Sequence, residues 1–498
     1  MTYIAAFDIG TTNVKGVLVD KHASITAERN IPLEVDHTGG YIEQHPESWY
    51  EAIAEIARSW FSSGIAESDI ALITFSGQMQ DCIAVKRDAA AVRPAILYSD
   101  GRAGEQSDHI LAELGEAAIT EATQNVMNGT LTLPKVLWLK EHERENYEAA
   151  DYFLISAKDY VIGKLTGSFV TDPTSAATSG SMDIRTREWK SDWLARLGLD
   201  ASKLPAIMAS DEEAGVVHAQ AAASTGFLEG TPVMCGIGDA GAATLGAGVY
   251  REGEVYAYIG TSGWVAAASS GFMDVSSGAF NLAYVESGKQ ITIAPMMNAG
   301  NAHKWALDVF GEGGFGSKDD AYAAFEVAIG AASRQSGVLF LPYLNGERCP
   351  VQDNRASGSF IGLRTTTTKA QMAAAVLEGV AMAMRQLMEL IVTTDGEKQV
   401  TLIGGGAKSK EWCRIMANVW DCTLVVPEDS QFLPSIGAAL LGFRRLEWGN
   451  DIGELCNRVK EKWQVEQYVP DPQQAGFYHD QFRKYKRLYP QLADLFAM

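Results

Sequence analysis

The fold of this chain is decided by the stretch Ala6-Phe7-Asp8-Ile9-Gly10-Thr11-Thr12, which returns half a chain later in related form as Ala257-Tyr258-Ile259-Gly260-Thr261-Ser262. Each copy joins an apolar run to a glycine and two hydroxyl-bearing residues, and a second apolar run follows. This pattern predicts a β-hairpin with glycine at its bend. Backbone N–H groups and hydroxyls that converge at such a bend are suited to hold phosphate. The two copies therefore predict a duplicated domain with one phosphorylated ligand between its halves.

The length and composition place the chain among ordinary globular proteins. Its 498 residues are too many for one hydrophobic core, so two or three domains are expected. The net charge of −21 argues against a nucleic-acid partner, because a surface that binds a phosphate backbone needs clustered Lys and Arg. No apolar stretch approaches the ~20 residues of a membrane span, so no membrane partner is expected either.

The cysteines, histidines and first residues indicate the compartment. The 6 cysteines are scattered without a C-x-x-C pair, which is typical of thiols in a reducing cytoplasm. The 8 histidines show no paired spacing, so a transition-metal site is not expected. A strand is predicted directly after Met1-Thr2, which leaves no room for a signal peptide. We therefore expect a cytoplasmic protein.

Strands and helices alternate along both halves, which predicts an α/β fold. The elements expected in the first half are the hairpin at 3–20, a strand near 24–34, a helix from Pro46, a strand at 70–75, and helices near 134–145 and 157–165. Those expected in the second half are a strand at 338–341, a helix at 369–391, a strand–helix–strand unit over 399–426 and a final helix at 475–495. No low-complexity linker separates residues 1–247 from residues 248–498, so we expect two domains that touch and hinge.

Asp8 stands inside an apolar strand, where a carboxylate without a partner is costly. One interpretation is a Mg²⁺ ion held beside a phosphate. The other is that the carboxylate caps the following Gly-Thr-Thr turn. The neighbouring Thr11, Thr12 and Lys15 favour the phosphate interpretation.

Three interpretations are open for Gly236-Ile237-Gly238-Asp239-Ala240-Gly241. The spacing matches G-x-G-x-x-G, which is typical of a dinucleotide site in a Rossmann oxidoreductase. However, only about nine residues remain before Gly248, which is short for a β-α-β crossover, and Asp239 would bring a negative charge to a pyrophosphate. Asp239 could instead cap a short helix. It could also act as a general base that accepts a proton from a sugar hydroxyl during phosphoryl transfer.

Three other loops carry glycine or charge directly after apolar strands. Gly404-Gly405-Gly406-Ala407 would let a flat or bulky group lie against the backbone, although a tight turn also uses glycine. Asp100-Gly101-Arg102 and Asn345-Gly346-Glu347-Arg348 are either surface turns or loops that position a polyol or a carboxylate.

With these motifs in order, the chain resembles the FGGY family of carbohydrate kinases, within the actin/Hsp70/hexokinase ATPase superfamily. The resemblance extends over nearly the whole chain. Thr132-Leu133-Pro134-Lys135-Val136-Leu137-Trp138 is similar to the family's first signature, and Gly358-Ser359-Phe360-Ile361-Gly362-Leu363 is similar to the region of its second. The resemblance implies two ribonuclease-H-like domains that flank a catalytic cleft, and an ATP-dependent kinase that phosphorylates a small sugar.

The resemblance also implies a role for each motif. Asp239 would be the catalytic base, and Asp8 would hold Mg²⁺ with the help of Asp239. The phosphates of ATP would contact Gly10, Thr11, Thr12, Lys15, Gly260, Thr261 and Ser262. The adenosine would lie on Gly404, Gly405, Gly406 and Ala407. The sugar would contact Gln78, Met79, Gln80, Asp81, Asp100, Arg102, Asp239 and Ala240.

Within the family, the sugar-facing motifs are most similar to the kinases of D-xylulose, which would yield D-xylulose 5-phosphate. Glycerol kinases would place an Arg-Glu pair at Met79-Gln80. Two positions depart from the D-xylulose pattern, because Gln80, followed by Asp81, stands where His is usual and Ala240 stands where Asn is usual. Another ketopentose, a polyol or a sugar acid is therefore an open alternative.

Rivals from other classes make different predictions. A Rossmann oxidoreductase would bind NADH at residues 236–241. A chaperone ATPase similar to Hsp70 shares the pattern from Asp8 to Thr12, but would release ADP without a dependence on sugar. A sugar-sensing regulator would need an added DNA-binding segment, which the chain lacks. The expected partners are a small sugar and ATP, with no nucleic acid and no membrane, and a homodimer as a possible assembly.

Overall fold

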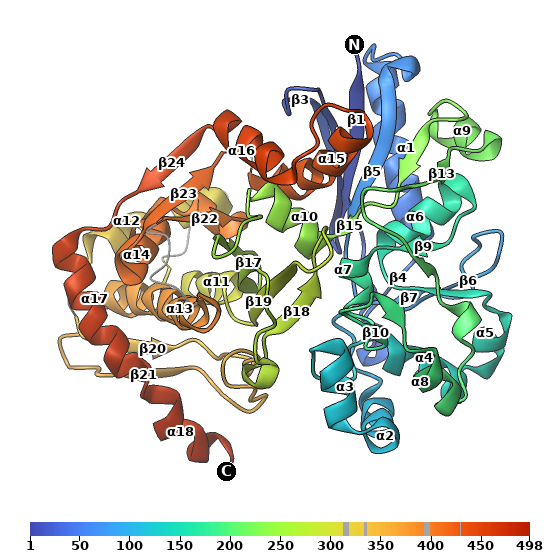
Figure 1. Ribbon diagram of the computed structural model, residues 1–498. Coiled ribbons are helices and arrows are strands. Elements are labelled where there is room, and N and C mark those ends of the chain that lie inside the picture. Colours follow the sequence, from blue (N-terminus) through green and yellow to red (C-terminus); the bar gives the residue numbers. More distant parts are fainter. Residues whose placement is uncertain (312–317, 333–335, 393–398, 429) are drawn as a thin grey trace.

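The computed structural model describes residues 1–311, 318–332, 336–392, 399–428 and 430–498. Its framework is a pair of mixed sheets, each with seven strands, one from each half of the chain (Figure 1). The first sheet has the order β13-β14-β5-β1-β2-β3, and β15 pairs with β5 off this path. Its strands are β1 (Tyr3–Ile9), β2 (Asn13–Val19), β3 (Ile25–Pro32), β5 (Ile70–Gly77), β13 (Glu213–Val216), β14 (Pro232–Met234) and β15 (Ile237–Gly238).

The second sheet has the order β18-β19-β17-β16-β22-β23-β24. Its strands are β16 (Val255–Ile259), β17 (Gly263–Ser269), β18 (Phe280–Ala283), β19 (Gln290–Met296), β22 (Gln399–Ile403), β23 (Thr423–Pro427) and β24 (Val465–Tyr468). In each sheet an antiparallel hairpin pairs in parallel with a later strand, β1 with β5 and β16 with β22. This repeated arrangement confirms the two predicted hairpins and the duplicated α/β architecture.

Both hairpins close with a backbone hydrogen bond at the glycine. The Gly10 N–H donates to the Asn13 carbonyl over 3.0 Å, and the Gly260 N–H donates to the Ser262 carbonyl over 2.8 Å. Thr12, Thr261 and Ser262 are exposed at the two bends. Their hydroxyls are therefore accessible to a ligand.

The helices cover the sheets with the apolar faces that the sequence predicts. In α1 (Glu47–Ser62), Trp49, Ile53, Ile56 and Trp60 are buried at helical spacing, and Pro46 directly precedes the first turn. In α13 (Lys369–Ile391), a capping box between Thr368 and Gln371 marks the start, as is common at helix N-termini. The unit β22, α14 (Lys410–Trp420) and β23 is a parallel β-α-β unit, as expected.

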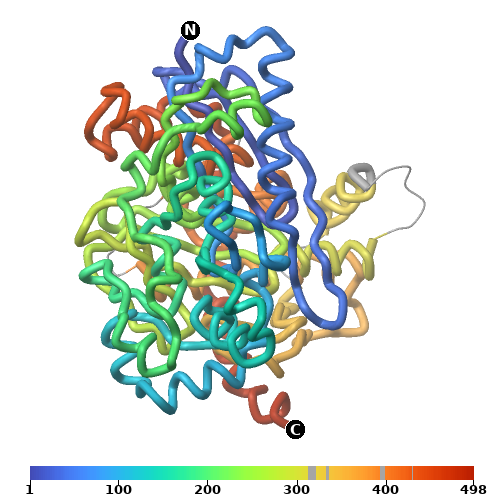
Figure 2. The backbone as a smooth tube through the Cα atoms, turned by 90° about the vertical axis from the view of Figure 1, so that its right-hand side faces the viewer, coloured from blue at the N-terminus to red at the C-terminus, as the bar shows by residue number. Residues whose placement is uncertain are grey.

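The two halves are joined by a pair of helices that cross closely. α10 (Asp239–Gly246) comes from the first half and α15 (Leu433–Arg445) from the second, and α15 also packs on β1 and β5 (Figure 1). Figure 2 shows the same region from the side, with the red segment of α15 and α16 (Ile452–Lys462) beside the blue N-terminal strands. One hydrophobic core runs through this junction and includes Ile4, Leu72, Leu440, Tyr256 and Ala266.

The C-terminal prediction was wrong in one respect. The expected single helix at 475–495 is two helices, α17 (Pro472–Tyr485) and α18 (Leu488–Phe496). Pro490 explains the break, because proline has no N–H to donate back along a continuous helix but is tolerated in the first turn of a new one. The helix expected near 134–145 likewise divides into α4 (Thr132–His142) and α5 (Arg144–Ala149).

None of the helices in the described ranges combines the length and apolarity needed to cross a bilayer.

Candidate active site

The carboxylate of Asp8 lies at the base of the first hairpin with two partners. The Ser76 hydroxyl, on the neighbouring strand β5, donates to Asp8 Oδ1 over 2.6 Å. Lys15, opposite Asp8 in β2, places its Nζ 3.6 Å from Oδ2. Asp8 is buried at 7% exposure, so these contacts supply the partners that a buried carboxylate needs.

Asp239 begins helix α10 directly after β15, which pairs with the end of β5. The Ala240 N–H donates to Asp239 Oδ1 over 2.7 Å. Burial, followed by the negative charge of Asp8, raises the Asp239 pKa to about 7; the Ala240 hydrogen bond opposes this rise, and Asp172 adds a smaller contribution to it. A carboxylate with a pKa near neutral is suited to general-base catalysis.

Gln78 connects the predicted sugar loop to the first hairpin. The Thr11 hydroxyl donates to Gln78 Oε1 over 2.7 Å, and Gln78 Nε2 donates to Gln44 Oε1 over 3.3 Å. Gln44 in turn donates through Nε2 to the Thr11 carbonyl over 3.0 Å. The side chain of Gln78 is thus engaged inside the protein and sets the distance between hairpin and loop.

Gln80 and Asp81 form the bend of this loop. Gln80 adopts a left-handed backbone with φ of 66°, and its Nε2 donates to the Thr130 hydroxyl over 2.6 Å. Asp81 is fully buried, and its Oδ1 accepts from the Tyr98 N–H over 2.9 Å. Asp81 Oδ2 has no hydrogen-bond partner within the described part of the chain, and burial raises the Asp81 pKa well above its usual range.

Lys135 holds the same bend in place through hydrogen bonds to the backbone. This buried lysine, which lies in the predicted signature segment, donates from Nζ to the carbonyls of Gln80 and Leu97, each over 2.8 Å. Burial lowers the Lys135 pKa to about 8, while Asp81 opposes that change. The lysine therefore links the bend at Gln80 to the segment that carries Tyr98.

The side chains of Asp100 and Arg102 form an ion pair with each other. Arg102 Nη2 lies 2.6 Å from Asp100 Oδ2, and the Ile42 N–H donates to the same oxygen over 2.6 Å. Arg102 Nη1 also lies 2.7 Å from Glu43 Oε1, and its guanidinium stacks 3.8 Å from the ring centroid of Tyr41. The structure therefore places this pair in an internal network beside the loop that is predicted to bind sugar.

Tyr258 of the second hairpin was not among the residues predicted from the sequence. It interacts electrostatically with Asp8 and Asp239. Burial, followed by the charges of Asp8 and Asp239, raises the Tyr258 pKa to about 12. Its ring stacks on Trp264 with centroids 3.8 Å apart. The one available signal was strand alternation, which places Tyr258 on the same face as Gly260.

The glycine motif of the second half lies against the end of β16. Gly404 has a φ of 95°, and a side chain there would collide with the Ile259 carbonyl, so only glycine fits. Gly405 has open space on its side-chain face, whereas Ala407 is buried. The motif and the second hairpin are thus parts of one rigid corner.

A buried cluster of charged side chains was also not predicted from the sequence. Lys158 Nζ lies 2.7 Å from Asp159 Oδ1 and 3.1 Å from Asp172 Oδ1, and all three side chains are fully buried. A side chain at Gly77 would collide with Lys158, and one at Gly238 would collide with Ser175 and Met79. Nothing in the sequence pattern distinguished Lys158 from an ordinary helix lysine.

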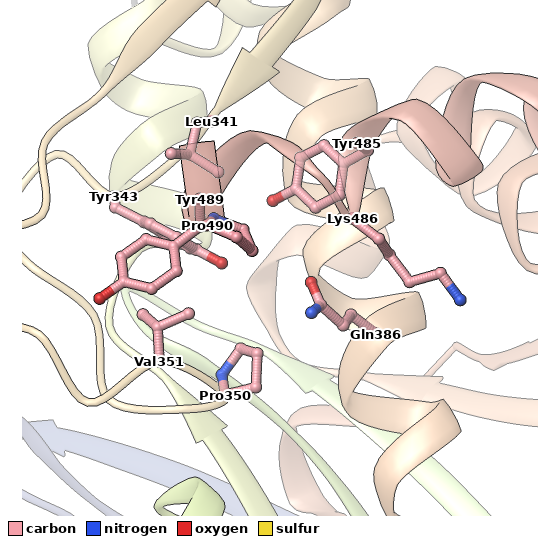
Figure 3. Close-up of a pocket in the computed structure, with 9 residues that line it drawn as sticks. All are labelled: Leu341, Tyr343, Pro350, Val351, Gln386, Tyr485, Lys486, Tyr489 and Pro490. Atoms are coloured by element: carbon pink, nitrogen blue, oxygen red, sulfur yellow. The ribbon is translucent and has the colours of Figure 1, made fainter. Parts of the chain in front are cut away.

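The cavity in Figure 3 is separate from these residues. It has a volume of about 270 Å³, and none of the predicted site residues lines it. Figure 3 shows Tyr343, Tyr485 and Tyr489 around it, with Gln386 from α13. The cavity therefore lies outside the proposed site.

Comparisons with known proteins identify relatives of the whole chain. Residues 3–246 match the N-terminal domain, and residues 255–446 the C-terminal domain, of the FGGY family of carbohydrate kinases. The xylulose kinase of Staphylococcus xylosus is 30% identical and covers 98% of this chain and 100% of its own. Two structures from Lactobacillus acidophilus superpose with a TM-score of 0.89 at 26% identity: a ligand-bound xylulose kinase, with 99% of each chain covered, and a gluconate kinase, with 99% of this chain and 98% of its own covered. The chain belongs to the FGGY family of carbohydrate kinases.

Proposed function

We propose that this sugar kinase transfers the γ-phosphate of ATP to D-xylulose and forms D-xylulose 5-phosphate. The observation that carries the proposal is Asp239, a buried carboxylate at the start of α10 with a pKa near 7, whose charge interacts with Asp8 of the first hairpin and Tyr258 of the second. Relatives named xylulose kinase support the choice of sugar.

In this proposal Asp239 accepts the proton of a sugar hydroxyl. The hydroxyl oxygen then bonds to the γ-phosphorus of ATP, the bond from that phosphorus to the bridging oxygen breaks, and ADP leaves. The hairpins hold the phosphates through Gly10, Thr11, Thr12, Lys15, Gly260, Thr261 and Ser262. The corner from Gly404 to Ala407 supports the adenosine.

Asp8 and Asp239 are the proposed protein ligands of Mg²⁺. The described residues contain no cluster of three or more acidic, histidine or cysteine ligands. Two neighbouring carboxylates nevertheless fit Mg²⁺, which is usually bound by one or two carboxylates plus phosphate oxygens and water. The mutual repulsion that helps to raise the Asp239 pKa indicates a place for positive charge. When bound, Mg²⁺ neutralises the phosphates of ATP.

The sugar pocket is proposed to form around the loop from Gln78 to Asp81, with Asp100, Arg102 and Ala240 beside it. Under the same proposal, residues 1–247 supply the sugar site and the first hairpin, and residues 248–498 supply the second hairpin and the adenosine site.

A sugar acid is the second candidate substrate. One of the superposed structures is titled gluconate kinase, and Gln80 and Ala240 depart from the D-xylulose pattern. An aldonate such as D-gluconate shares the chain of hydroxyls but adds a carboxylate.

An ADP-release screen tests both candidates. The purified enzyme is mixed with Mg²⁺, ATP and one acceptor at a time: D-xylulose, D-ribulose, L-xylulose, ribitol or D-gluconate. We expect the highest kcat/KM with D-xylulose, and a kcat about 10²–10⁴-fold lower in the Asp239→Asn protein. ADP release that is independent of any acceptor would contradict a sugar kinase, and a higher kcat/KM with D-gluconate would replace the substrate.

We also propose that the enzyme acts in the cytoplasm and assembles as a homodimer. All six cysteines are buried free thiols, which suits a reducing compartment. Light scattering coupled to size-exclusion chromatography measures the assembly, and a monomer mass would contradict the dimer.

A further inference from the structure

The loop from Asn345 to Arg348 is anchored by a buried carboxylate. Glu347 is fully buried, and its Oε1 accepts from the N–H of Met297 over 2.6 Å and from the N–H of Arg348 over 2.8 Å. Asn298 Nδ2 donates to the Gly346 carbonyl over 2.7 Å. The backbone from which the Arg348 side chain projects is therefore held in place.

The same scaffold holds the second phosphate hairpin. Helix α11 (Gly300–Phe310) begins two residues after Asn298, and its first N–H groups bond to the hairpin bend. Gly300 donates to the Gly260 carbonyl and Asn301 donates to the Thr261 carbonyl, each over 3.0 Å. Arg348 is thus tied to the hairpin through one short, hydrogen-bonded segment.

The side chain of Arg348 lacks the partners that the other cations of this region have. Lys15 pairs with Asp8, Lys158 with two aspartates, and Arg102 with Asp100 and Glu43. Arg348 is half-buried, yet its guanidinium forms no ion pair or side-chain hydrogen bond with any residue in the described ranges.

The charge of Arg348 also acts on a residue of the first half of the chain. Burial raises the pKa of Tyr98, Asp239 and Asp81 add to that rise, and Thr11 and Arg348 oppose it. A guanidinium from the second half therefore acts on Tyr98, whose backbone N–H donates to Asp81 of the loop after β5. An unpaired cation at this position is suited to an anionic ligand.

We propose that Arg348 is a catalytic residue that contacts the transferring γ-phosphoryl group and stabilises the negative charge on its oxygens in the transition state. The proposal rests on the sugar-kinase function above. An arginine stays protonated throughout the transfer, and its planar donors match phosphate oxygens. Such a cation acts most strongly where charge develops during phosphoryl transfer.

The test compares Arg348→Gln and Arg348→Lys with a control, Arg355→Gln. Arg355 is a 66% exposed arginine of the same segment and pairs with Asp353, 3.6 Å away. We expect Arg348→Gln to lower kcat by about 10²–10³-fold, as for removal of one transition-state donor, while KM for D-xylulose and Kd for MgADP stay within about threefold. Arg348→Lys keeps the positive charge but lacks the planar arrangement of guanidinium donors, so it should retain intermediate activity. The control should match the parent.

Binding of MgADP with aluminium fluoride and D-xylulose supplies a second readout, because this mixture imitates the transferring group. Arg348→Gln should lose affinity for it by the same factor as kcat. Unchanged kcat, or a loss confined to KM for sugar or to D-gluconate, would overturn the proposal. If the Arg348→Gln protein does not fold, the Arg348→Lys protein replaces it. An Arg348→Lys protein with the kcat of the parent would then overturn the proposal. If the parent enzyme phosphorylates no acceptor, the proposed function fails, and binding of MgADP with aluminium fluoride still reports on Arg348.

Discussion

At the scale of single residues, the raised pKa that suits Asp239 to its proposed role as a base also lowers the stability of the folded protein. Its pKa is about 7 in the folded protein, against an ordinary value of 3.8. Between these values the folded state binds the proton more tightly than the unfolded state, so stability falls as pH rises from about 4 to about 7. Above pH 7 the full penalty, on the order of 4 kcal/mol, is present.

The first prediction is that Asp239→Asn abolishes most turnover and stabilises the fold. The amide cannot accept the proton, so kcat should fall by about 10²–10⁴-fold. MgADP affinity, measured by calorimetry, should stay nearly unchanged. The Tm at pH 8 should exceed that of the parent, with a smaller difference at pH 5. A variant with parental kcat would remove Asp239 from the proposed role.

The pH dependence of the parent enzyme gives the second prediction. Because the base must be deprotonated, kcat/KM should fall about tenfold per pH unit below an apparent pKa near 7. Steady-state rates between pH 5 and 9 measure this limb. The residual activity of Asp239→Asn should lack it, and a flat profile down to pH 5 in the parent would exclude Asp239 as the titrating group.

The third prediction concerns Gln80 and Ala240, which depart from the pattern of D-xylulose kinases. Gln80 is bonded to Thr130, and Ala240 offers no side-chain polar group toward a substrate. Each hydrogen bond to a polar substrate is worth on the order of 1 kcal/mol. The double variant Gln80→His with Ala240→Asn should therefore raise kcat/KM for D-xylulose relative to other sugars. A lower value, in an enzyme that already prefers D-xylulose, would show that these positions do not set specificity.

At the scale of elements, the crossing of α10 and α15 positions Asp239, the proposed catalytic base. A side chain at Gly437 would collide with the Ala242 carbonyl, and one at Gly246 would collide with the Leu433 carbonyl. Backbone carbonyls cannot move aside as a flexible side chain can. Two glycines on facing helices therefore permit the close contact that holds the start of α10, and with it Asp239, in place.

The fourth prediction is that Gly437→Ala destabilises the protein, although alanine is the better helix former. Overpacking at this crossing should cost about 1–3 kcal/mol and lower both Tm and kcat. Gly476→Ala is the matched control, because Gly476 lies in α17 with open space on its side-chain face. The control should be neutral or slightly stabilising. Equal Tm values for the two variants would contradict the close crossing.

At the scale of the whole molecule, the halves are connected by contacts in addition to the shared core. Asn125 Nδ2 donates to the Asn281 carbonyl over 2.8 Å, and the Asn281 N–H donates to Asn125 Oδ1 over 2.9 Å. The Thr174 hydroxyl donates to the Ala283 carbonyl over 2.7 Å. These bonds connect the first half to strand β18. Any motion of one half relative to the other must therefore rotate about this connection.

The fifth prediction is that the halves close when both substrates bind. The phosphate hairpins belong to different sheets, so full contact with one ATP requires them to approach, and closure excludes water. Small-angle scattering should show a smaller radius of gyration with D-xylulose and a non-hydrolysable ATP analogue than with either ligand alone. An unchanged radius would count against a hinge.

Local patterns in the sequence were sufficient for much of the fold. Two hairpins, helix α13 and the β22-α14-β23 unit follow from apolar periodicity, turn glycines and caps, which act between residues near one another in the chain. The final helix was mispredicted because Pro490 was not weighed against an otherwise continuous apolar pattern. The site residues proposed from motifs remain predictions, although the structure brings Asp8, Asp239 and Gln78 to one region.

What only the tertiary structure decided is which groups meet. Apolar alternation placed Tyr258 in a strand, but its proximity to Asp8 and Asp239 depends on how the two sheets pack. The burial of Lys158 between two aspartates and the unpaired charge of Arg348 likewise depend on segments far apart in sequence. Burial and long-range charge shift a pKa through neighbours in space. The sequence alone therefore determined the family and the elements, and tertiary packing determined the chemistry of the site.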